Sequence, residues 1–237
     1  MHNRLLISAA FFFSLLFGTN VSGLISSNTT WSQANSPYVV TGNLLINTGV
    51  TLNIEPGVLI KVDAGKYIKV EGNIIAIGSL NEIITFESND LQEKSAWDGI
   101  RIRPNSGSAI DSNQEYLSGS QFKHVSFKHA DRALYIYETG LHISFCQFST
   151  NNKGIEIRST TDVVVDNCTF VNNDYGTWSE YEDYSSGDYV NAIENTYIQS
   201  SLFFSNITGL YLITNQRSFI NLNIRDNIFE QNNIGIS

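Results

Sequence analysis

The chain contains two adjacent copies of one sequence unit, Ile143-Ser144-Phe145-Cys146-Gln147-Phe148-Ser149-Thr150-Asn151-Asn152-Lys153-Gly154 and Val165-Asp166-Asn167-Cys168-Thr169-Phe170-Val171-Asn172-Asn173-Asp174-Tyr175-Gly176. A cysteine, a phenylalanine, an asparagine and a glycine stand at the same spacing in both copies. The unit recurs on both sides, at spacings of 21, 22, 33 and 26 residues, centred on Phe127, Phe148, Phe170, Phe203 and Phe229. This stretch therefore indicates a repeat protein.

Other positions of the unit recur together with the phenylalanine. Five positions before it the chain has Phe122, Ile143, Val165, Ile198 and Ile224. Three positions after it stand Ala130, Asn151, Asn173, Asn206 and Asn232, and six positions after it stand Ala133, Gly154, Gly176, Gly209 and Gly235. Short β-type runs that repeat about every 22 residues predict a solenoid with three strands and three turns per coil, in which equivalent residues stack about 4.8 Å apart.

The segment from Trp31 to Ile102 has the same β character. Runs such as Thr51-Leu52-Asn53-Ile54 alternate apolar and polar residues, which is the pattern of a strand with one buried face. The runs are separated by turn-forming glycines: Gly42, Gly49, Gly57, Gly65, Gly72 and Gly78. Antiparallel hairpins of a β-sandwich are the alternative fold for such runs. The repeated unit favours the parallel solenoid, so we predict an all-β fold and a single domain over residues 24–237.

The N-terminus resembles a secretory signal. An apolar run from Leu5 to Phe17 follows Arg4, and small and polar residues follow from Gly18 to Gly23. The run is shorter than the roughly 20 residues that a membrane-spanning helix needs. We expect cleavage after Gly23, with an uncleaved anchor as the alternative, and therefore a secreted, extracellular or cell-surface protein. No other segment is apolar enough to form a transmembrane helix.

The charge balance excludes one class of partner. The chain has 14 basic and 23 acidic side chains, and removal of Arg4 with the signal leaves 13 against 23, a net charge of −10. Nucleic-acid binding needs a clustered basic surface, which the sequence does not supply. With two cysteines the chain is not a disulfide-dense mini-domain, and its length allows a large core without such bonds.

Specific motifs of the N-terminal half resemble those of secreted right-handed parallel β-helix proteins of the pectate-lyase-like superfamily. They are Trp31-Ser32, Ser36-Pro37-Tyr38-Val39-Val40, Val50-Thr51-Leu52-Asn53-Ile54-Glu55-Pro56-Gly57-Val58, Val70-Glu71-Gly72, Ala76-Ile77-Gly78, Ile84-Thr85-Phe86 and Trp97-Asp98-Gly99-Ile100. The repeats described above extend the resemblance almost to the C-terminus. The resemblance implies a right-handed β-helix, and these motifs are more typical of non-catalytic surface and adhesion proteins than of the enzymes in the superfamily.

Motifs for polysaccharide cleavage are absent. A glycoside hydrolase of this superfamily uses paired carboxylates, one as acid and one to activate water. Asp162 and Asp166 share a coil but do not match the family pattern. Arg101 and Arg103 resemble the basic segment of pectate lyases, yet they alternate with Ile100 and Ile102 as the solvent-facing residues of a strand. An enzyme, a lyase or hydrolase of acidic polysaccharide, is therefore the alternative rather than the main hypothesis.

Metal and cofactor binding have weak support in the sequence. His124, His129 and His142 do not have the spacing of a metal site. We expect no cofactor, except that a weak Ca²⁺ site could form from carboxylates in the insert described next.

The candidate binding site is an insert of about 11 residues, which lengthens the spacing between Phe170 and Phe203. It falls in the segment from Tyr175 to Tyr189, which carries Trp178, Glu180, Tyr181, Glu182, Asp183, Tyr184 and Asp188. Aromatic rings interleaved with carboxylates on a segment that leaves the solenoid suit sugar binding. A solvated acidic loop without a ligand is the alternative. A second excursion, Asn105 to Glu115, is polar.

The recurring polar positions have structural interpretations. The asparagines of the repeat are expected to stack as an amide ladder, with sugar binding as the alternative. Cys146 and Cys168 are expected to be neighbours in adjacent coils, either as a disulfide or as two buried thiols. Asn28, Asn167 and Asn206 begin N-glycosylation sequons, and the nearby ladder restricts access to Asn167.

We therefore predict a secreted or surface-displayed scaffold that binds a polysaccharide, a surface glycan or a partner protein without turning it over. The last residues, Asn232 to Ser237, stop where earlier coils begin their next strand. A solenoid that ends there exposes unpaired backbone groups. We expect the chain either to continue in a longer protein or to associate through this C-terminal edge.

Overall fold

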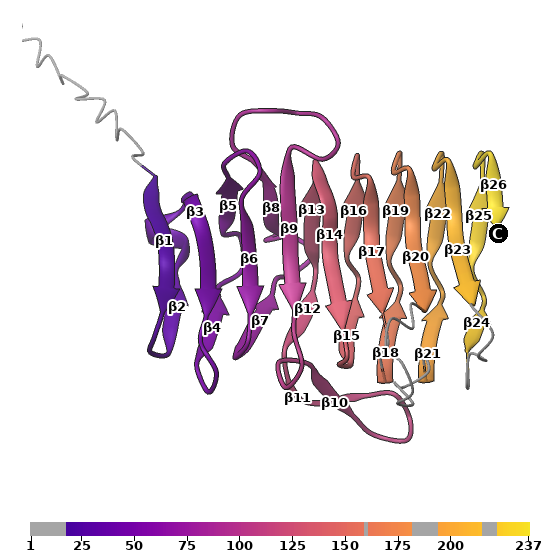
Figure 1. Cartoon of the computed structure of the whole chain (residues 1–237), viewed down its shortest axis with the longest axis horizontal. Helices are drawn as coiled ribbons and strands as arrows, with labels where there is room; N and C mark the ends of the chain where they lie inside the picture. The colour runs from indigo at the N-terminus through magenta and orange to yellow at the C-terminus, as the bar shows by residue number, and fades with distance from the viewer. Residues whose placement is uncertain (1–17, 159–160, 182–193, 215–221) are drawn as a thin grey trace, which may run out of the picture.

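The computed structural model describes residues 18–158, 161–181, 194–214 and 222–237. Apart from one short 3-10 turn, Gln33–Asn35, all regular structure in these residues is β-strand. The strands stack as successive coils, with the N-terminal coils at one end and the C-terminal coils at the other (Figure 1). The predicted all-β solenoid, with three strands per coil, is confirmed.

Three parallel faces run along the stack, and we name them by their position in Figure 1. The front limb contains β6 (Tyr67–Val70), β9 (Trp97–Ile102), β14 (Ala130–Tyr137), β17 (Lys153–Arg158), β20 (Tyr175–Tyr181), β23 (Thr208–Thr214) and β26 (Ile234–Ile236). The rear limb contains β5 (Leu59–Val62), β8 (Ile84–Ser88), β13 (Val125–Lys128), β16 (Gln147–Ser149), β19 (Thr169–Val171), β22 (Leu202–Phe204) and β25 (Ile228–Glu230). The lower sheet contains β2 (Thr29–Trp31), β4 (Thr51–Ile54), β7 (Asn73–Ile77), β12 (Gln121–Lys123), β15 (Leu141–Ser144), β18 (Thr161–Asp166), β21 (Glu194–Gln199) and β24 (Asn223–Arg225).

The two limbs join in the N-terminal coils through β3 (Tyr38–Ile46). Its first residues pair with β5 and its last residues pair with β6, so one strand continues from the rear limb into the front limb. The apolar runs around Val39 and Leu45, which are separate in the sequence pattern, therefore belong to a single strand. β1 (Thr19–Ile25) pairs in parallel with β3 at the N-terminal end. The signal segment predicted to end at Gly23 thus overlaps β1, and its residues 1–17 lie outside the described part.

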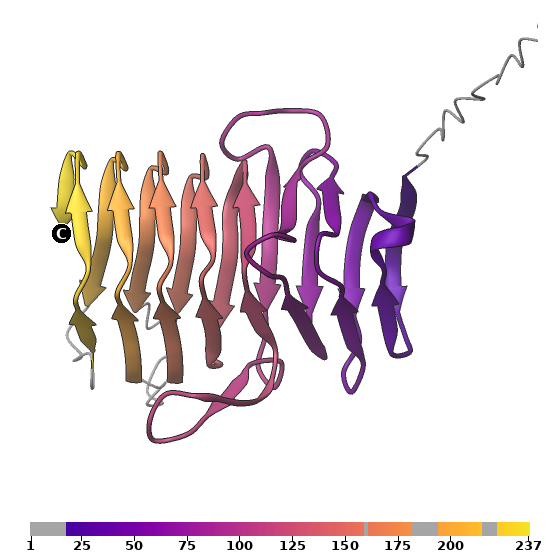
Figure 2. The same cartoon turned by 180° about the vertical axis from the view of Figure 1, so that it is seen from behind.

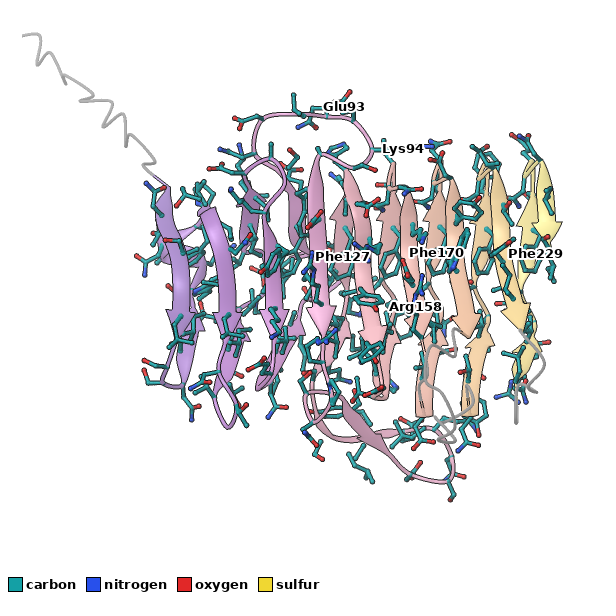
Figure 3. All side chains as sticks on the ribbon, in the orientation of Figure 1. Glu93, Lys94, Phe127, Arg158, Phe170 and Phe229 are labelled. Carbon is teal, nitrogen blue, oxygen red and sulfur yellow. The ribbon has the colours of Figure 1, made fainter. Side chains whose placement is uncertain are left out.

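The interior is a column of phenylalanine rings. Strand register places Phe86, Phe127, Phe148, Phe170, Phe203 and Phe229 one above another in the rear limb. From Phe127 onward the neighbouring ring centroids are 4.6–4.9 Å apart and the rings are nearly parallel. Phe86 adds a sixth ring at 5.4 Å, one coil before the first repeat that the sequence reveals. The column runs inside the stack, where Figure 3 labels Phe127, Phe170 and Phe229.

Tight corners between strands use single residues in the left-handed conformation. Between the lower sheet and the rear limb, φ is between 51° and 56° at His124, Phe145, Asn167, Ser200 and Asp226. Between the two limbs, φ is between 53° and 64° at His129, Thr150, Asn172, Ser205 and Gln231. Non-glycine residues are uncommon there and carry strain, so the stacked coils on either side must hold them in place.

The glycines of the repeat serve close packing rather than turns. A Cβ atom on Gly154 would lie 2.5 Å from the carbonyl oxygen of Gly176 and 2.9 Å from the ring of Phe170. Gly176 and Gly209 have equivalent neighbours in the next coil. The glycine therefore makes room for the phenylalanine ring that stacks beside it.

Two excursions leave the stack at opposite edges (Figures 1 and 2). The loop between β8 and β9 arches over the upper edge, where Lys94 forms an ion pair with Asp174 at 2.6 Å. At the lower edge the chain between β9 and β12 forms an antiparallel hairpin of β10 (Ser108–Ile110) and β11 (Tyr116–Gly119). No helix in the described residues is long and apolar enough to cross a membrane.

At the C-terminal end the last strands leave apolar side chains exposed. Ile228, Ile234 and Ile236 are each about half exposed, and Phe229 is only partly buried. Phe229 is the last ring of the column in the described residues, and no described strand follows β25 and β26 on this side. Association through this edge stays a prediction.

The loss of stability on removing a ring of the phenylalanine column should depend on the position of that ring. Phe170→Ala removes a fully buried ring between two stacked neighbours and should lower the free energy of unfolding by about 3–5 kcal/mol. Phe229→Ala, at the partly exposed end of the same column, should cost clearly less. Denaturant unfolding of both variants measures the difference, and equal losses would show that the column does not act as a buried stack.

Candidate functional site

The outer face of the front limb carries arginine, lysine, tyrosine, tryptophan and glutamate side chains in its described strands. Its strands alternate buried and solvent-facing residues, so Ile100 and Ile102 are fully buried while Arg101 and Arg103 point outward. Strand register aligns the outward positions into rows across successive coils. One row runs through Lys69, Arg101, Tyr135, Glu156, Trp178 and Tyr211. A second, adjacent row contains Tyr67, Arg132, Lys153 and Tyr175.

Cations and aromatic rings pair on this face, both within these rows and beside them. The guanidinium of Arg101 lies 3.9 Å from the ring centroid of Tyr67, that of Arg103 lies 4.8 Å from Tyr137, and that of Arg132 lies 5.1 Å from Tyr135. Each distance is within the range of a cation–π interaction. The aromatic side chains thus hold the cations in defined places on the face instead of leaving them free in solvent.

A second aromatic group lies two coils further on. The ring of Trp178 is 4.2 Å from Tyr211 and 4.5 Å from Tyr175, and the ammonium of Lys153 lies 4.2 Å from its centroid. All four side chains are partly exposed. Trp178 therefore joins the arginine-rich part of the face to an aromatic cluster.

A buried carboxylate organises the centre of the face. Glu156 is 1% exposed, and its oxygens lie 2.8 Å from Lys153 Nζ and 2.6 Å from Arg158 Nε. Arg132 Nε is 3.9 Å away, so three cations surround one carboxylate. The cations keep 16–29% of their side-chain surface exposed. The cluster therefore presents positive charge outward, while the compensating negative charge of Glu156 is buried.

The charges around Glu156 also affect the pKa of Tyr135. Burial raises the pKa of the Tyr135 hydroxyl, and the nearby guanidiniums of Arg158, Arg103 and Arg132 oppose that rise. Four cations, Arg103, Arg132, Lys153 and Arg158, thus lie near three carboxylates, those of Glu156, Asp131 and Glu138. A chain of net charge −9 gathers local positive charge here.

The structure changes the interpretation of the predicted insert. Tyr175–Tyr181 is strand β20, paired in register with β17 and β23, so Trp178 lies on the face of the solenoid and the insert begins later than predicted. Glu180 and Tyr181 belong to the same strand. The other residues of the predicted site lie outside the described residues: Glu182, Asp183, Tyr184 and Asp188. The proposed weak Ca²⁺ site depends on those residues.

The remaining carboxylates considered for hydrolysis are not a pair. Asp162 and Asp166 lie at opposite ends of β18, four residues apart, which corresponds to about 13 Å along a strand. Asp162 accepts a hydrogen bond from Asn195 at 3.0 Å. Glycoside hydrolases hold their carboxyl groups roughly 5–9.5 Å apart. Among the described residues, no three His, Cys, Asp or Glu side chains gather as a metal site.

The asparagines of the repeat form a hydrogen-bonded ladder at the corner between the two limbs. Asn173 Nδ2 donates to Phe148 O and to Asn206 Oδ1, both at 3.0 Å, and Asn173 Oδ1 accepts from the backbone and side chain of Asn151. Asn232 ends the ladder by accepting from Asn206. These amides satisfy buried backbone groups, so their polar atoms are not free for a sugar.

The predicted modification sites differ in accessibility. Cys146 and Cys168 are both buried free thiols, and burial raises the pKa of Cys168. Asn206 is 2% exposed, and its side-chain amide donates to Phe170 O within the ladder, so this sequon is buried in the folded chain. Asn167 is exposed at its corner, contrary to the expected restriction, and Asn28 is also exposed.

Sequence reasoning missed most of the front-limb face. In the sequence, nothing distinguishes four residues of this face from ordinary outward residues of a strand: Tyr135, Lys153, Glu156 and Arg158. Aligning the coils on their phenylalanines would have placed Glu156 beside Trp178, because both stand eight residues after the phenylalanine of their coil.

Comparison with known proteins gives family matches only. A family model described as a pectate-lyase-like β-helix domain matches residues 23–125, and one described as a right-handed β-helix region matches residues 79–237. No curated protein and no solved structure matches the chain. Since the second model covers more than half of the sequence and the strands form parallel coils, the chain belongs to the right-handed β-helix family.

Proposed function

We propose that this protein is a secreted or cell-surface scaffold that binds acidic glycans without cleaving them, and that the front-limb face is the binding surface. The observation that carries the proposal is the group of outward cations, Arg103, Arg132, Lys153 and Arg158, set among aromatic rings on one rigid sheet. Secretion rests on the signal-like N-terminal segment.

The chemistry of this face suits a chain that carries carboxylate or sulfate groups. Guanidinium groups bind planar anions through paired hydrogen bonds, and they keep their charge at any physiological pH. Arg103 has no carboxylate partner among the described residues; its contacts are the ring of Tyr137 and the turn at Ser106. Trp178 and Tyr211 add flat apolar surface beside the cations, against which a sugar ring can pack.

The same geometry favours binding over turnover. Acid–base cleavage of a glycosidic bond needs two carboxyl groups with separate roles. The carboxylate at the centre of the front-limb face, Glu156, is buried and held by three cations. A lyase or hydrolase of acidic polysaccharide is the competing function, and it is an outcome of the test below.

Loss of the cationic or aromatic contacts should weaken binding. Arg103→Gln should reduce affinity for an acidic oligosaccharide such as oligogalacturonate at least about tenfold, since a charge-assisted hydrogen bond contributes about 1.5–3 kcal/mol. Trp178→Ala should also reduce affinity, because it removes the ring against which a sugar packs. Lys61→Gln, on the outer face of the rear limb, is the matched control and should bind like the unchanged protein. Calorimetric titration measures all four proteins.

The same samples test for catalysis. Incubation with pectin and alginate should release no uronide and no unsaturated product. Turnover that is lost on changing a single carboxylate would contradict the proposal and establish the enzyme instead. Equal binding by all variants would remove the front-limb face as the site.

A substitution at Glu156 should change stability and glycan affinity in opposite directions. Glu156→Gln removes the negative charge that compensates Lys153, Arg158 and Arg132, so folding should weaken by about 1–3 kcal/mol because the partners are only partly exposed. The same change makes the face more positive, so affinity for an acidic glycan should rise. A variant that is less stable and also binds less would show that the cluster acts only in folding.

A further inference from the structure

The cations of the front limb stop abruptly along the stack of coils. Strands β9, β14 and β17 carry Arg101, Arg132, Lys153 and Arg158, and Arg103 directly follows β9. The next two strands, β20 and β23, contain no lysine or arginine. These five strands are neighbours in one sheet (Figure 1). The outer face of the front limb is therefore divided into a part with cations and a part without them.

Aromatic side chains take the outward positions where the cations stop. Strand register continues the row of Glu156 through Trp178 of β20 and Tyr211 of β23. The ring centroids of Trp178 and Tyr211 are 4.2 Å apart, and the ring of Tyr175 lies 4.5 Å from Trp178 and 5.6 Å from Tyr211. The ammonium of Lys153 lies 4.2 Å from the centroid of Trp178. The aromatic group thus begins directly beside β17, the last front-limb strand that carries a cation.

The spacing of the strands relates this division to the ligand. Neighbouring strands lie about 4.8 Å apart, close to the length of one residue in an extended pyranose chain. A glycan that crosses the strands therefore places about one sugar residue on each. The guanidinium and ammonium groups on β9, β14 and β17 suit acidic sugar residues. The rings on β20 and β23 suit uncharged ones, because a carboxylate there would lose water without gaining a cationic partner.

We infer that the front-limb face selects a mixed polysaccharide, in which a run of about three acidic sugar residues adjoins uncharged ones. The inference rests on the proposed binding of acidic glycans at this face, and it adds the pattern of charge along the ligand. The acidic residues lie on β9, β14 and β17, and the uncharged residues pack against Trp178 and Tyr211. Tyr211 determines specificity for the uncharged part, since its ring contacts Tyr175 and Trp178 and lies two strands beyond β17.

The test is a calorimetric titration of the full chain at pH 7 with oligosaccharides of defined charge. The probes are trigalacturonate, pentagalacturonate, and the two mixed pentasaccharides that carry methyl esters on both residues at one end of pentagalacturonate. The better of the mixed pentasaccharides should bind about tenfold more tightly than the trisaccharide, because its uncharged residues add contacts with the rings. It should bind at least as tightly as the fully acidic pentasaccharide. Equal affinity of the trisaccharide and the mixed pentasaccharides would overturn the inference.

Substitutions of Tyr211 assign the gain in affinity to the aromatic group. Tyr211→Ala should remove most of the gain of the mixed pentasaccharide and leave the affinity for the trisaccharide unchanged, which also shows that the variant is folded. Tyr211→Phe keeps the ring and should keep the gain. Arg103→Gln should weaken binding of the trisaccharide and the mixed pentasaccharide by the same factor. A gain that persists in Tyr211→Ala would contradict the assignment.

Salt provides a readout that needs no substitution. Affinity for the trisaccharide should fall as salt rises, because partly exposed cations are screened. The ratio between the affinities for the mixed pentasaccharide and the trisaccharide should stay constant, because packing of an uncharged sugar against a ring is not screened. A ratio that falls with rising salt would show that the extra residues bind through charge, and the inference would be wrong.

These outcomes separate the inference from the function on which it rests. If none of the oligosaccharides binds, the proposed function fails and the inference fails with it. If the trisaccharide and all pentasaccharides bind equally well, the front limb still binds acidic glycans and only the inferred charge pattern is wrong. Lys61→Gln, on the rear limb, should behave as the unchanged protein with every probe.

Discussion

In-register stacking of parallel coils is the constraint on which the rest of the structure depends. Each interior position lies against its equivalent one coil away, so a side chain that packs well in one coil must pack well in all of them. The column from Phe86 to Phe229 satisfies this with parallel rings, and the glycines beside it leave the space that the rings need. At the corner between the limbs, Asn151, Asn173 and Asn206 satisfy the backbone groups that the turn would otherwise leave buried and unpaired.

This regular interior leaves the outer faces free to vary. Outward positions have no requirement to match between coils, and on the front limb they change from tyrosine to glutamate to tryptophan along one row. The strands still hold these side chains about 4.8 Å apart on a rigid sheet, which suits recognition of a polymer. Burying Glu156 under three cations fixes their positions and leaves their positive charge facing solvent. The proposed binding surface therefore consists of non-repeating outward residues and not of the repeated interior ones.

The fold could be predicted because its signal is repeated five times. The spacing of Phe148 and Phe170, and the asparagines and glycines that follow them, indicate a solenoid without further information. The sites could not be predicted in the same way. The lengthened spacing between Phe170 and Phe203 places Trp178 in an insert, and the polar inward neighbours Thr177 and Ser179 in β20 hide the alternation of a strand. A hydrogen bond from Arg225 to Gln114 joins β24 to the tip of the β10–β11 hairpin across 111 residues, and no local sequence pattern shows that approach.

The central claim is that the front limb recognises negative charge on a glycan. The most direct test is the affinity of the protein for a polyuronate chain compared with the same chain after its carboxyl groups have been reduced to alcohols, at low and at physiological salt. Our account predicts that the reduced chain loses binding and that affinity for the polyuronate falls as salt rises, because partly exposed cations are screened. Equal affinity for both chains, independent of salt, would contradict it.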